Sequence, residues 1–399
     1  MELSGISYLD DLDLSGRRVF VRVDFNVPLA GGEVRDDARI RAALPTITHL
    51  RKCGAHVVLA SHLGRPKGSP KADLSLEPCA KRLAELLDCE IRFADDCVGE
   101  GVEKVVRDLP EGEVAVLENL RFHAAEEAGD PAFAAKLAEP FDAYVNDAFG
   151  TCHRPHASMY GIVRHLSTRC AGFLIQKELE YLGRVLNEPA TPFVAILGGA
   201  KVSDKIGVIR ALSSRCDTIL IGGAMAYTFL KAQGVEVGKS LVEEDKLDLA
   251  SELLKGSAGR KAKIMLPVDH LVAANINADE GIESNVSIPT DMAGFDIGPT
   301  TVVAFSDVIA KAGTVFWNGP LGVFEKKPFS GGTFAVARAV ARSRAVSVVG
   351  GGDSAAAVDE AGLASEISHV STGGGASLQF MEGRSLPGIE ALRSGHQFE

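Results

Sequence analysis

Hydrophobic residues along the chain gather in short runs, most of which are followed by a polar loop and then by a stretch with helical spacing. This alternation predicts βα units whose parallel strands are buried on both faces. The expected strands of the first half are 19–23, 56–60, 113–117 and 142–145. Those of the second half are 193–197, 218–221, 263–266, 314–317, 347–349 and 368–370. We therefore predict an α/β protein with two doubly wound, Rossmann-like parallel sheets.

A predicted helix separates the two groups of strands. Apolar residues between 174 and 186 recur as on one face of a helix, and the segment 187–192 then carries two prolines that end it. A chain of 399 residues is long for one core, so a domain is expected on each side of this helix. The short connection favours hinge motion over independent tumbling of the domains.

Composition narrows the class of protein. With 46% hydrophobic and 24% charged residues, the chain is expected to be globular. Its apolar runs are far shorter than the ~20 residues that cross a bilayer. Residues 1–13 lack the basic start and the apolar run of a signal peptide, so a cytoplasmic location is expected.

Cysteines and charge exclude further classes. The seven cysteines are scattered without a CxxC pair, which predicts reduced, mostly buried thiols and neither a disulfide framework nor a thiolate metal site. His153 and His156 form an HxxH, but no third metal ligand stands at a supporting spacing, so a structural role is favoured. The net charge of −11 argues against binding nucleic acid or an anionic membrane. An anionic ligand would need a local basic pocket.

Glycine clusters follow several strands of the second half. They stand at 198–199, 222–223, 350–352 and 373–375, beside Lys201, Lys205, Asp353 and Ser354. Glycine lets a backbone approach a phosphate closely and leaves helix N-terminal amides free to bind it. Four clusters together predict a nucleotide-phosphate site with a metal ligand. Residues 234–240 end in Gly-Lys-Ser, but the first glycine is one residue too close for a P-loop, so we expect a surface turn there.

The strand ends of the first half carry cations instead. The polar residues in these loops are Asp24, Asn26, Arg39, His62, Arg65, Arg121 and Arg154. One such arginine would be taken for a surface ion pair. Several together would repel one another unless an anion neutralises them, and guanidinium groups suit carboxylate and phosphate. A polyanion site in one domain and a nucleotide site in the other indicate phosphoryl transfer, which needs little covalent chemistry from the protein.

At these residues the sequence resembles the phosphoglycerate kinase family. The motifs are RVDFNVP at 22–28, SHLGRP at 61–66, ENLRF at 118–122, NDAFGTCHRPHAS at 146–158, GGAKVSDKI at 198–206, WNGPLGVFE at 317–325, GGGDS at 350–354 and STGGGASL at 371–378. They cover essentially the whole chain in order. Departures at Cys152, Pro155, Ala224 and Ser354 remove neither a charge nor a phosphate donor.

The resemblance implies reversible transfer of a phosphoryl group from 1,3-bisphosphoglycerate to MgADP, which gives 3-phosphoglycerate and MgATP. It assigns the substrate to Asp24, Asn26, His62, Arg65, Arg121 and Arg154, with Arg39 at the reacting carboxyl group. It assigns the nucleotide to Lys201, Lys205, Gly222, Gly223, Gly294, Asn318, Pro320, Glu325, Gly351, Gly352, Asp353 and Ser354, with Mg²⁺ at Asp353. Catalysis is assigned to Arg39, Lys205 and the amides of Gly373, Gly374 and Gly375.

The family also implies the domain plan and the oligomeric state. A substrate domain at 1–172, a helix at 173–186 and a nucleotide domain at 187–372 would be followed by a segment, 373–399, that returns to the first domain. The family is usually monomeric, and its partners are small molecules.

Two other functions remain open at this stage. A non-catalytic receptor that closes on a phosphorylated metabolite would explain the hinge and the cations, but not the glycine clusters, and it would not bind MgADP. A dinucleotide-dependent dehydrogenase would need a GxGxxG after a strand, which the chain lacks. Arg39 could instead pair with Asp36 or Asp37, and Lys205 could be a solvated helix lysine beside Asp204.

Overall fold

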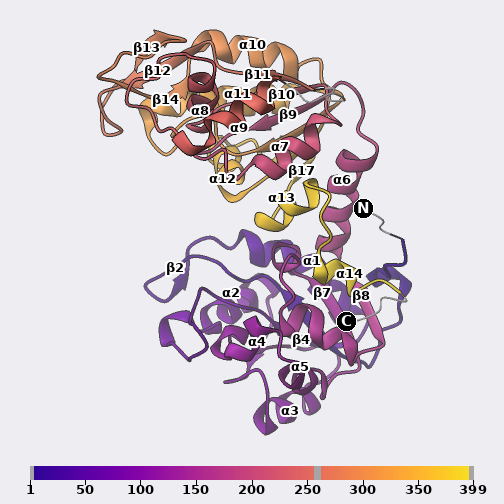
Figure 1. The fold of residues 1–399 in the computed structure, drawn as a ribbon. Coiled ribbons are helices and arrows are strands. Elements are labelled where there is room, and N and C mark those ends of the chain that lie inside the picture. The colour runs from indigo at the N-terminus through magenta and orange to yellow at the C-terminus, as the bar shows by residue number, and fades with distance from the viewer. Residues whose placement is uncertain (1–3, 256–261, 395–399) are drawn as a thin grey trace. The chain divides into compact units, whose positions relative to one another are not determined.

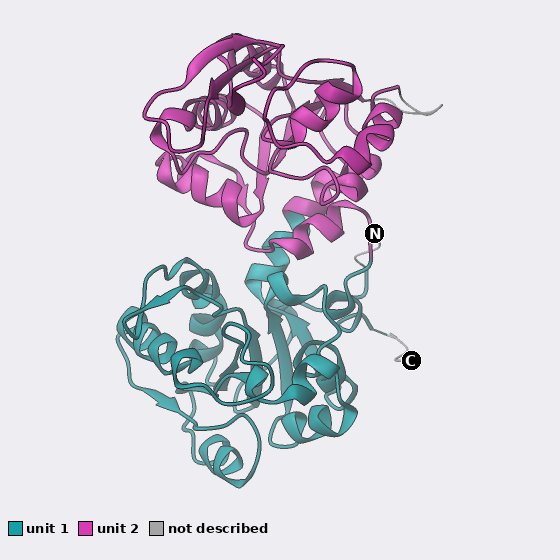
Figure 2. Ribbon diagram, turned by 60° about the vertical axis from the view of Figure 1, so that its left-hand side comes forward, with its two compact units in different colours: residues 1–180, 385–399 teal, residues 181–384 magenta. Residues whose placement is uncertain are grey.

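The computed structural model describes residues 4–255 and 262–394. It divides into two compact units, Met1–Glu180 with Ser385–Glu399 and Tyr181–Arg384 (Figure 2). The boundary falls inside the helix that the sequence predicted, which is α6 (Phe173–Asn187). Residues 373–384 of the predicted returning segment group with the second unit and 385–394 with the first, while 395–399 lie outside the described residues.

The first unit is built on a six-stranded sheet of order β5-β6-β4-β1-β7-β8, whose neighbours all pair in parallel. Figure 1 labels β4, β7 and β8 of this sheet. Its strands are β1 (Arg18–Val23), β4 (His56–Ala60), β5 (Ile91–Phe93), β6 (Val114–Val116), β7 (Ala143–Asp147) and β8 (Thr168–Ala171). The short strands β2 (Leu29–Ala30) and β3 (Glu33–Val34) form a separate antiparallel pair.

Strand β1 shows why the sheet is buried on both faces. Val19, Val21 and Val23 pack in one core with residues of α1 (Ala38–Lys52) and α2 (Glu77–Leu87). Phe20, on the opposite face, stacks on Tyr144 with ring centroids 6.0 Å apart. The strand is therefore apolar on both sides, as expected for a central parallel strand.

Short helices complete the first unit. They are α3 (Glu100–Arg107), α4 (Ala124–Ala128), α5 (Pro131–Ala138) and α14 (Pro387–Glu390). Helix α5 begins where Asp130 accepts a hydrogen bond of 2.8 Å from Phe133 N and proline occupies the first turn.

Chain segments from both ends meet in this unit. Gly388 N donates to Cys152 O at 2.9 Å, and Asn146 Nδ2 donates to Gly388 O at 3.2 Å. Ser394 N donates to Gly5 O at 2.7 Å. Leu386 and Ile389 are buried, so apolar residues anchor this part of the chain in the first unit.

The second unit is built on another six-stranded sheet, of order β11-β10-β9-β15-β16-β17, again with parallel neighbours. Its strands are β9 (Phe193–Leu197), β10 (Thr218–Ile221), β11 (Lys263–Met265), β15 (Thr314–Asn318), β16 (Val346–Gly350) and β17 (His369–Val370). Its helices are α7 (Ile206–Ser213), α8 (Met225–Ala232), α9 (Leu247–Lys255), α10 (Pro299–Ile309), α11 (Gly331–Arg342), α12 (Gly352–Glu360) and α13 (Gly375–Met381). The two parallel sheets confirm the predicted fold class.

Some strands were not predicted. In the second unit, β12 (Asp269–Ala273), β13 (Ile282–Asn285) and β14 (Ala293–Ile297) form a small antiparallel sheet of order β13-β12-β14. Strand β13 is mostly exposed and has no hydrophobic alternation, so its sequence carries no strand signal. In the first unit β5 and β8 were not predicted either, and they have only three and four residues. Among the described residues, no helix is both long and apolar enough to cross a membrane.

Candidate active site

Arg22 is a residue of strand β1, not of the loop after it, and it is fully buried. Its Nη2 lies 3.2 Å from His62 Nδ1, its Nε donates to Ser158 Oγ at 2.9 Å, and its Nη1 donates to Val23 O. Burial, followed by the charges of Arg22, Arg121, Arg154 and Arg39, lowers the pKa of His62 well below its usual value. His62 is therefore a neutral side chain inside a cationic cluster.

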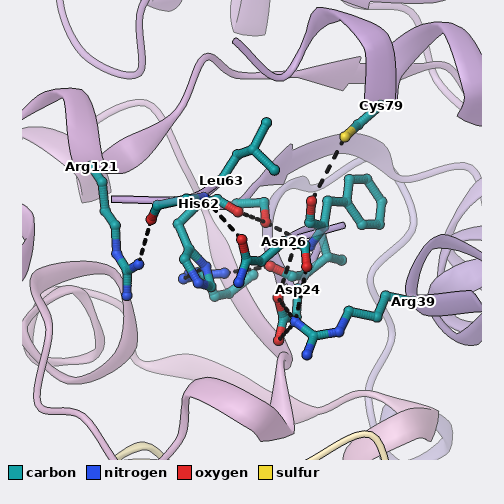
Figure 3. A network of polar contacts seen from close by, with 12 residues as sticks. Asp24, Asn26, Arg39, His62, Leu63, Cys79 and Arg121 are labelled. Carbon is teal, nitrogen blue, oxygen red and sulfur yellow. Dashed lines mark hydrogen bonds and ion pairs between the residues drawn. The ribbon is translucent and has the colours of Figure 1, made fainter. Parts of the chain in front are cut away.

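Asp24, Asn26 and Arg39 form a network beside this cluster (Figure 3). Arg39 Nη1 lies 3.1 Å from both carboxylate oxygens of Asp24 and donates to Asn26 O at 3.2 Å. Asn26 Oδ1 accepts from Gly64 N at 2.9 Å, which ties the loop after β1 to the loop after β4. Arg39 does not pair with Asp36 or Asp37, so that alternative is wrong in this structure.

Arg121 is 3% exposed in its side chain and follows β6. Its Nη1 donates to Gly64 O at 2.8 Å (Figure 3). Its Nε lies 3.3 Å from Glu127 Oε1. Nε and Nη2 make no hydrogen bond to any described residue. Burial is the main reason that the pKa of Arg121 is lowered, and Arg154 and Arg22 act in the same direction. These donors are available to an anion.

The other two candidate arginines are more open. Arg154 Nε lies 3.2 Å from His153 Nε2, and burial lowers the pKa of His153. Arg65 is exposed and has no ion pair within the described part of the chain. The structure thus places Asp24, Asn26, His62 and Arg121 in one connected group, with Arg65 and Arg154 on neighbouring loops.

Two residues that the sequence analysis did not assign position the loops. Asn119 Oδ1 accepts from Leu63 N at 3.2 Å and from Arg121 N at 3.1 Å, while its Nδ2 donates to Leu63 O at 2.8 Å. Glu118 accepts from Leu76 N at 2.8 Å and from Ser75 Oγ at 2.7 Å. Both lie in the ENLRF motif, yet only the fold shows that they bind backbone.

A buried carboxylate was also missed. Glu126 is fully buried and accepts from Ser158 N at 2.9 Å and from Ser158 Oγ at 2.5 Å. Burial raises its pKa, and the nearby Arg22 opposes that shift. Ser158 thus joins the buried cation Arg22 to the buried anion Glu126. His156 Nδ1 lies 3.9 Å from Glu126 Oε1 and makes no hydrogen bond to a described residue.

In the second unit, Lys205 immediately precedes α7 and contacts Asn318, the last residue of β15. Its Nζ donates to Asn318 Oδ1, and Asn318 Nδ2 donates to Gly350 O at 2.7 Å. Burial lowers the pKa of Lys205, while the carboxylates of Asp204 and Asp353 oppose the shift. Lys205 is half-buried between strand ends and is not the solvated helix lysine of the alternative interpretation.

The loop after β16 opens helix α12. Ser354 is buried, and its Oγ accepts from Gly319 N at 2.5 Å. Asp353 is exposed in the first turn and has no ion pair with a described residue. Gly351 has a φ of 95°, and a Cβ there would lie 2.9 Å from Asn318 Nδ2, so glycine is required.

The glycines fall into two groups. A Cβ on Gly198 would lie 2.1 Å from Pro320 O, one on Gly222 2.4 Å from Leu321 Cδ2, and one on Gly223 2.6 Å from Gly199 N. These three glycines allow loops to pack against one another, which the phosphate interpretation did not anticipate. At Gly352 and Gly374, in contrast, a Cβ would meet no atom within 4 Å beyond the neighbouring residues, so the space beside these two turns is open.

The remaining nucleotide candidates occupy several places in the unit. Pro320 O accepts from Gly199 N at 2.9 Å, and Gly373 N donates to Ser371 Oγ at 3.1 Å at the turn that leads to Gly375 and α13. Gly294 lies in β14, where a Cβ would be 2.1 Å from the Tyr227 hydroxyl. Lys201 and Glu325 are exposed on the loops after β9 and β15. Their roles toward a nucleotide stay predictions.

A cavity of about 650 Å³ in the second unit is distinct from these residues. It is lined by α10 and α11 near their C-terminal ends, among them Asp307, Ala310 and Arg342. Those helix ends lead into the first residues of β15 and β16. The cavity is therefore at the amino-terminal edge of the sheet, whereas ligands of such sheets bind at the carboxyl edge.

Comparisons with known proteins agree with this architecture. The family profile described as phosphoglycerate kinase matches residues 9–384. A phosphoglycerate kinase of Anaeromyxobacter sp. (strain K) is 60% identical over 388 residues, which cover 96% of this chain and 98% of the relative. One of Koribacter versatilis (strain Ellin345) is 55% identical over 395 residues, at coverages of 96% and 98%. The crystal structure titled phosphoglycerate kinase from Pyrococcus horikoshii OT3 has a TM-score of 0.85 at 36% identity and covers 96% of this chain and 98% of that one. The structure titled phosphoglycerate kinase from Coxiella burnetii has a TM-score of 0.87 at 40% identity, with coverages of 97% and 98%.

Proposed function

The chain belongs to the phosphoglycerate kinase family, and from this premise we propose that it transfers a phosphoryl group reversibly between 1,3-bisphosphoglycerate and MgADP. The reaction yields 3-phosphoglycerate and MgATP, with a carboxyl group as the acceptor in the reverse direction. The enzyme would act in glycolysis and gluconeogenesis, as a cytoplasmic monomer.

The observation that carries the substrate half of the proposal is the state of Arg121. A guanidinium that is 3% exposed, with two nitrogens not hydrogen-bonded to any described residue, is costly unless a ligand completes its bonds. A phosphate or carboxylate supplies acceptors in the matching planar geometry. The neighbouring cations Arg22 and Arg154 favour an anion at the same place. A phosphorylated carboxylic acid fits this combination.

The nucleotide half rests on the strand ends of the second unit. The open amides at Gly352 and Gly374 suit phosphate oxygens, and each immediately precedes or begins a helix. Asp353, in the first turn of α12, offers an exposed carboxylate that has no ion pair with a described residue. A carboxylate is the ligand type that Mg²⁺ prefers. When bound with the nucleotide, the ion would neutralise phosphate charge. Asp353 would hold it.

Transfer itself needs cations around the moving group. We assign Arg39 and Lys205 to this role, with Gly373, Gly374 and Gly375 presenting amides. Two opposite unit charges ~4 Å apart in an effective dielectric of ~20 have an interaction energy of about 4 kcal/mol. Arg39→Ala and Lys205→Ala are therefore each expected to lower kcat by about a hundredfold or more, and far more than they raise KM. A near-normal kcat in a variant with an intact circular dichroism spectrum would remove that residue from catalysis.

A coupled assay with 3-phosphoglycerate and MgATP tests the function directly. Turnover is expected, together with separate calorimetric binding of 3-phosphoglycerate and of MgADP. Absence of turnover, with both substrates bound, would contradict the catalytic proposal. Binding of the metabolite without any binding of MgADP would instead favour the receptor.

A further inference from the structure

Three side chains with metal-binding atoms meet where β5 and β6 end. Asp96 and Cys97 follow β5, and His123 lies beyond β6, immediately before α4. A carboxylate oxygen, the Cys97 Sγ and a ring nitrogen of His123 lie within 4.8 Å of one another. We propose that this triad binds a divalent transition-metal ion of the Zn²⁺ class.

The triad is held by contacts that leave one side open. His123 Nε2 lies 2.7 Å from Asp96 Oδ1, and Cys97 N donates to the same oxygen at 2.6 Å. The His123 ring stacks on Phe133 with centroids 5.1 Å apart. Cys97 is 2% exposed, whereas the side chains of Asp96 and His123 are 52% and 32% exposed. An ion can therefore enter from solvent and reach a thiol in the interior.

The ligand chemistry selects the class of metal. Thiolate, imidazole and carboxylate are the groups that bind Zn²⁺, at about 2.0–2.3 Å, which places the ligand atoms of a tetrahedral site about 3.3–3.6 Å apart. Atoms that are now up to 4.8 Å apart must approach by about 1.2–1.5 Å, while Asp96 Oδ1 and His123 Nε2, now 2.7 Å apart, must separate slightly. The exposed Asp96 side chain can turn to allow this change. Mg²⁺ and Ca²⁺ prefer oxygen ligands alone, so a buried thiol disfavours them. Water would complete the coordination.

Binding couples to protons in a defined way. A thiol ligand gives up its proton to solvent as the S–metal bond forms. The ion also replaces the hydrogen bond between Asp96 Oδ1 and His123 Nε2.

The alternative is a structural role, in which the Asp96–His123 pair only joins two loops. Cobalt spectroscopy distinguishes this role from metal binding. The full-length, nucleotide-free protein is titrated with CoCl₂, and absorption from thiolate-to-cobalt charge transfer is recorded. We expect a saturable band that ZnCl₂ abolishes by competition. Cys97→Ser should remove the band, and His123→Gln and Asp96→Asn should each weaken cobalt binding at least about tenfold.

Matched controls are available in the same unit. Cys89→Ser removes a half-buried thiol outside the triad, and Asp95→Asn removes the exposed carboxylate next to Asp96, so both should leave the band and the affinity unchanged. A band that persists in Cys97→Ser, or none in the unmodified protein, would overturn the proposal. If Cys97→Ser does not fold, the cobalt affinities of His123→Gln and Asp96→Asn test the proposal instead. Unchanged cobalt affinity in both variants would show that the triad has a structural role and does not bind metal.

Discussion

Arg121 is a charged side chain with the burial of a core residue. Glu127 and Glu126 favour its charge, while the further arginines Arg154 and Arg22 oppose it, and burial is the largest unfavourable effect. A buried charge of this kind is retained at a cost in stability, and its replacement by an apolar side chain of similar length is often neutral or stabilising. Binding and folding therefore place opposite demands on this position.

Arg121→Met separates these demands. We expect the free energy of unfolding to stay within about 1 kcal/mol of the unmodified protein, because the loss of the bond to Gly64 O and of the ion pair with the half-exposed Glu127 is offset by relief of the buried charge. Affinity for 3-phosphoglycerate should fall tenfold or more, since each hydrogen bond to a charged group is worth about 1.5–3 kcal/mol. Denaturant unfolding and calorimetry measure the two quantities. As a control, Arg51→Met on α1 should change the free energy of unfolding and the metabolite affinity less than Arg121→Met does. If Arg121→Met binds 3-phosphoglycerate as tightly as the unmodified protein, Arg121 is not part of the site.

His156 predicts a loss of stability in mild acid. Burial and the charges of Arg22, Arg121 and Arg154 lower its pKa to about 3, against about 6.5 in an unfolded chain. As pH falls below 6.5, the His156 side chain of the unfolded chain takes up a proton, whereas that of the folded protein does not. The free energy of unfolding is therefore unaffected by this group above pH 6.5 and decreases on acidification below it. His156→Gln should reduce the loss of unfolding free energy between pH 7 and pH 5 by roughly 1–2 kcal/mol. The exposed His165→Gln serves as control, and identical pH profiles for His156→Gln and the unmodified protein would contradict the assignment.

At the scale of elements, two adjacent glycines at the start of α12 differ in backbone conformation and in the space around them. Gly351 has a φ of 95° and precedes the helix, whereas a Cβ on Gly352 would meet no atom within 4 Å. Two adjacent glycines are thus present for different reasons. The first is required by the fold, and the second is free to serve a ligand.

Alanine substitutions distinguish these reasons. Gly351→Ala should destabilise the protein by about 1–3 kcal/mol, because an alanine there must adopt a conformation that is nearly restricted to glycine. Gly352→Ala should leave the melting temperature nearly unchanged and should weaken MgADP binding, because its methyl group occupies the space next to the amides. Thermal unfolding and nucleotide calorimetry provide both readouts. Normal MgADP affinity in Gly352→Ala would show that phosphate does not bind there.

The sequence predicted the long central strands well, because apolar residues on both faces leave little ambiguity in β1 or β9. It failed for β13, whose residues are mostly exposed, since a strand held by its neighbours needs no pattern of its own. Candidate residues could be found by charge, as for Arg121. Those that act through packing or backbone bonds, such as Asn119 and Gly198, depend on contacts between distant segments that no single motif contains.

For the whole molecule, we expect closure to require both ligands. The proposed substrate residues and the proposed nucleotide residues lie in different units, and an acyl phosphate must be protected from water during transfer. Small-angle scattering should give a smaller radius of gyration with 3-phosphoglycerate and a non-hydrolysable MgATP analogue together than with either alone. Equal compaction by a single ligand would contradict a two-ligand requirement.

The first unit contains residues from both ends of the chain, and this has a consequence for synthesis on the ribosome. Residues 181–384 all leave the ribosome before 385–394, so the second unit can complete its core while the first still lacks Leu386, Ile389 and Leu392. Multidomain chains generally fold their N-terminal domain first during synthesis. In this chain the first unit cannot complete its core until residues 385–394 have been made. We therefore expect a chain cut before residue 385 to expose apolar surface on its first unit and to be degraded faster by proteases than the full chain.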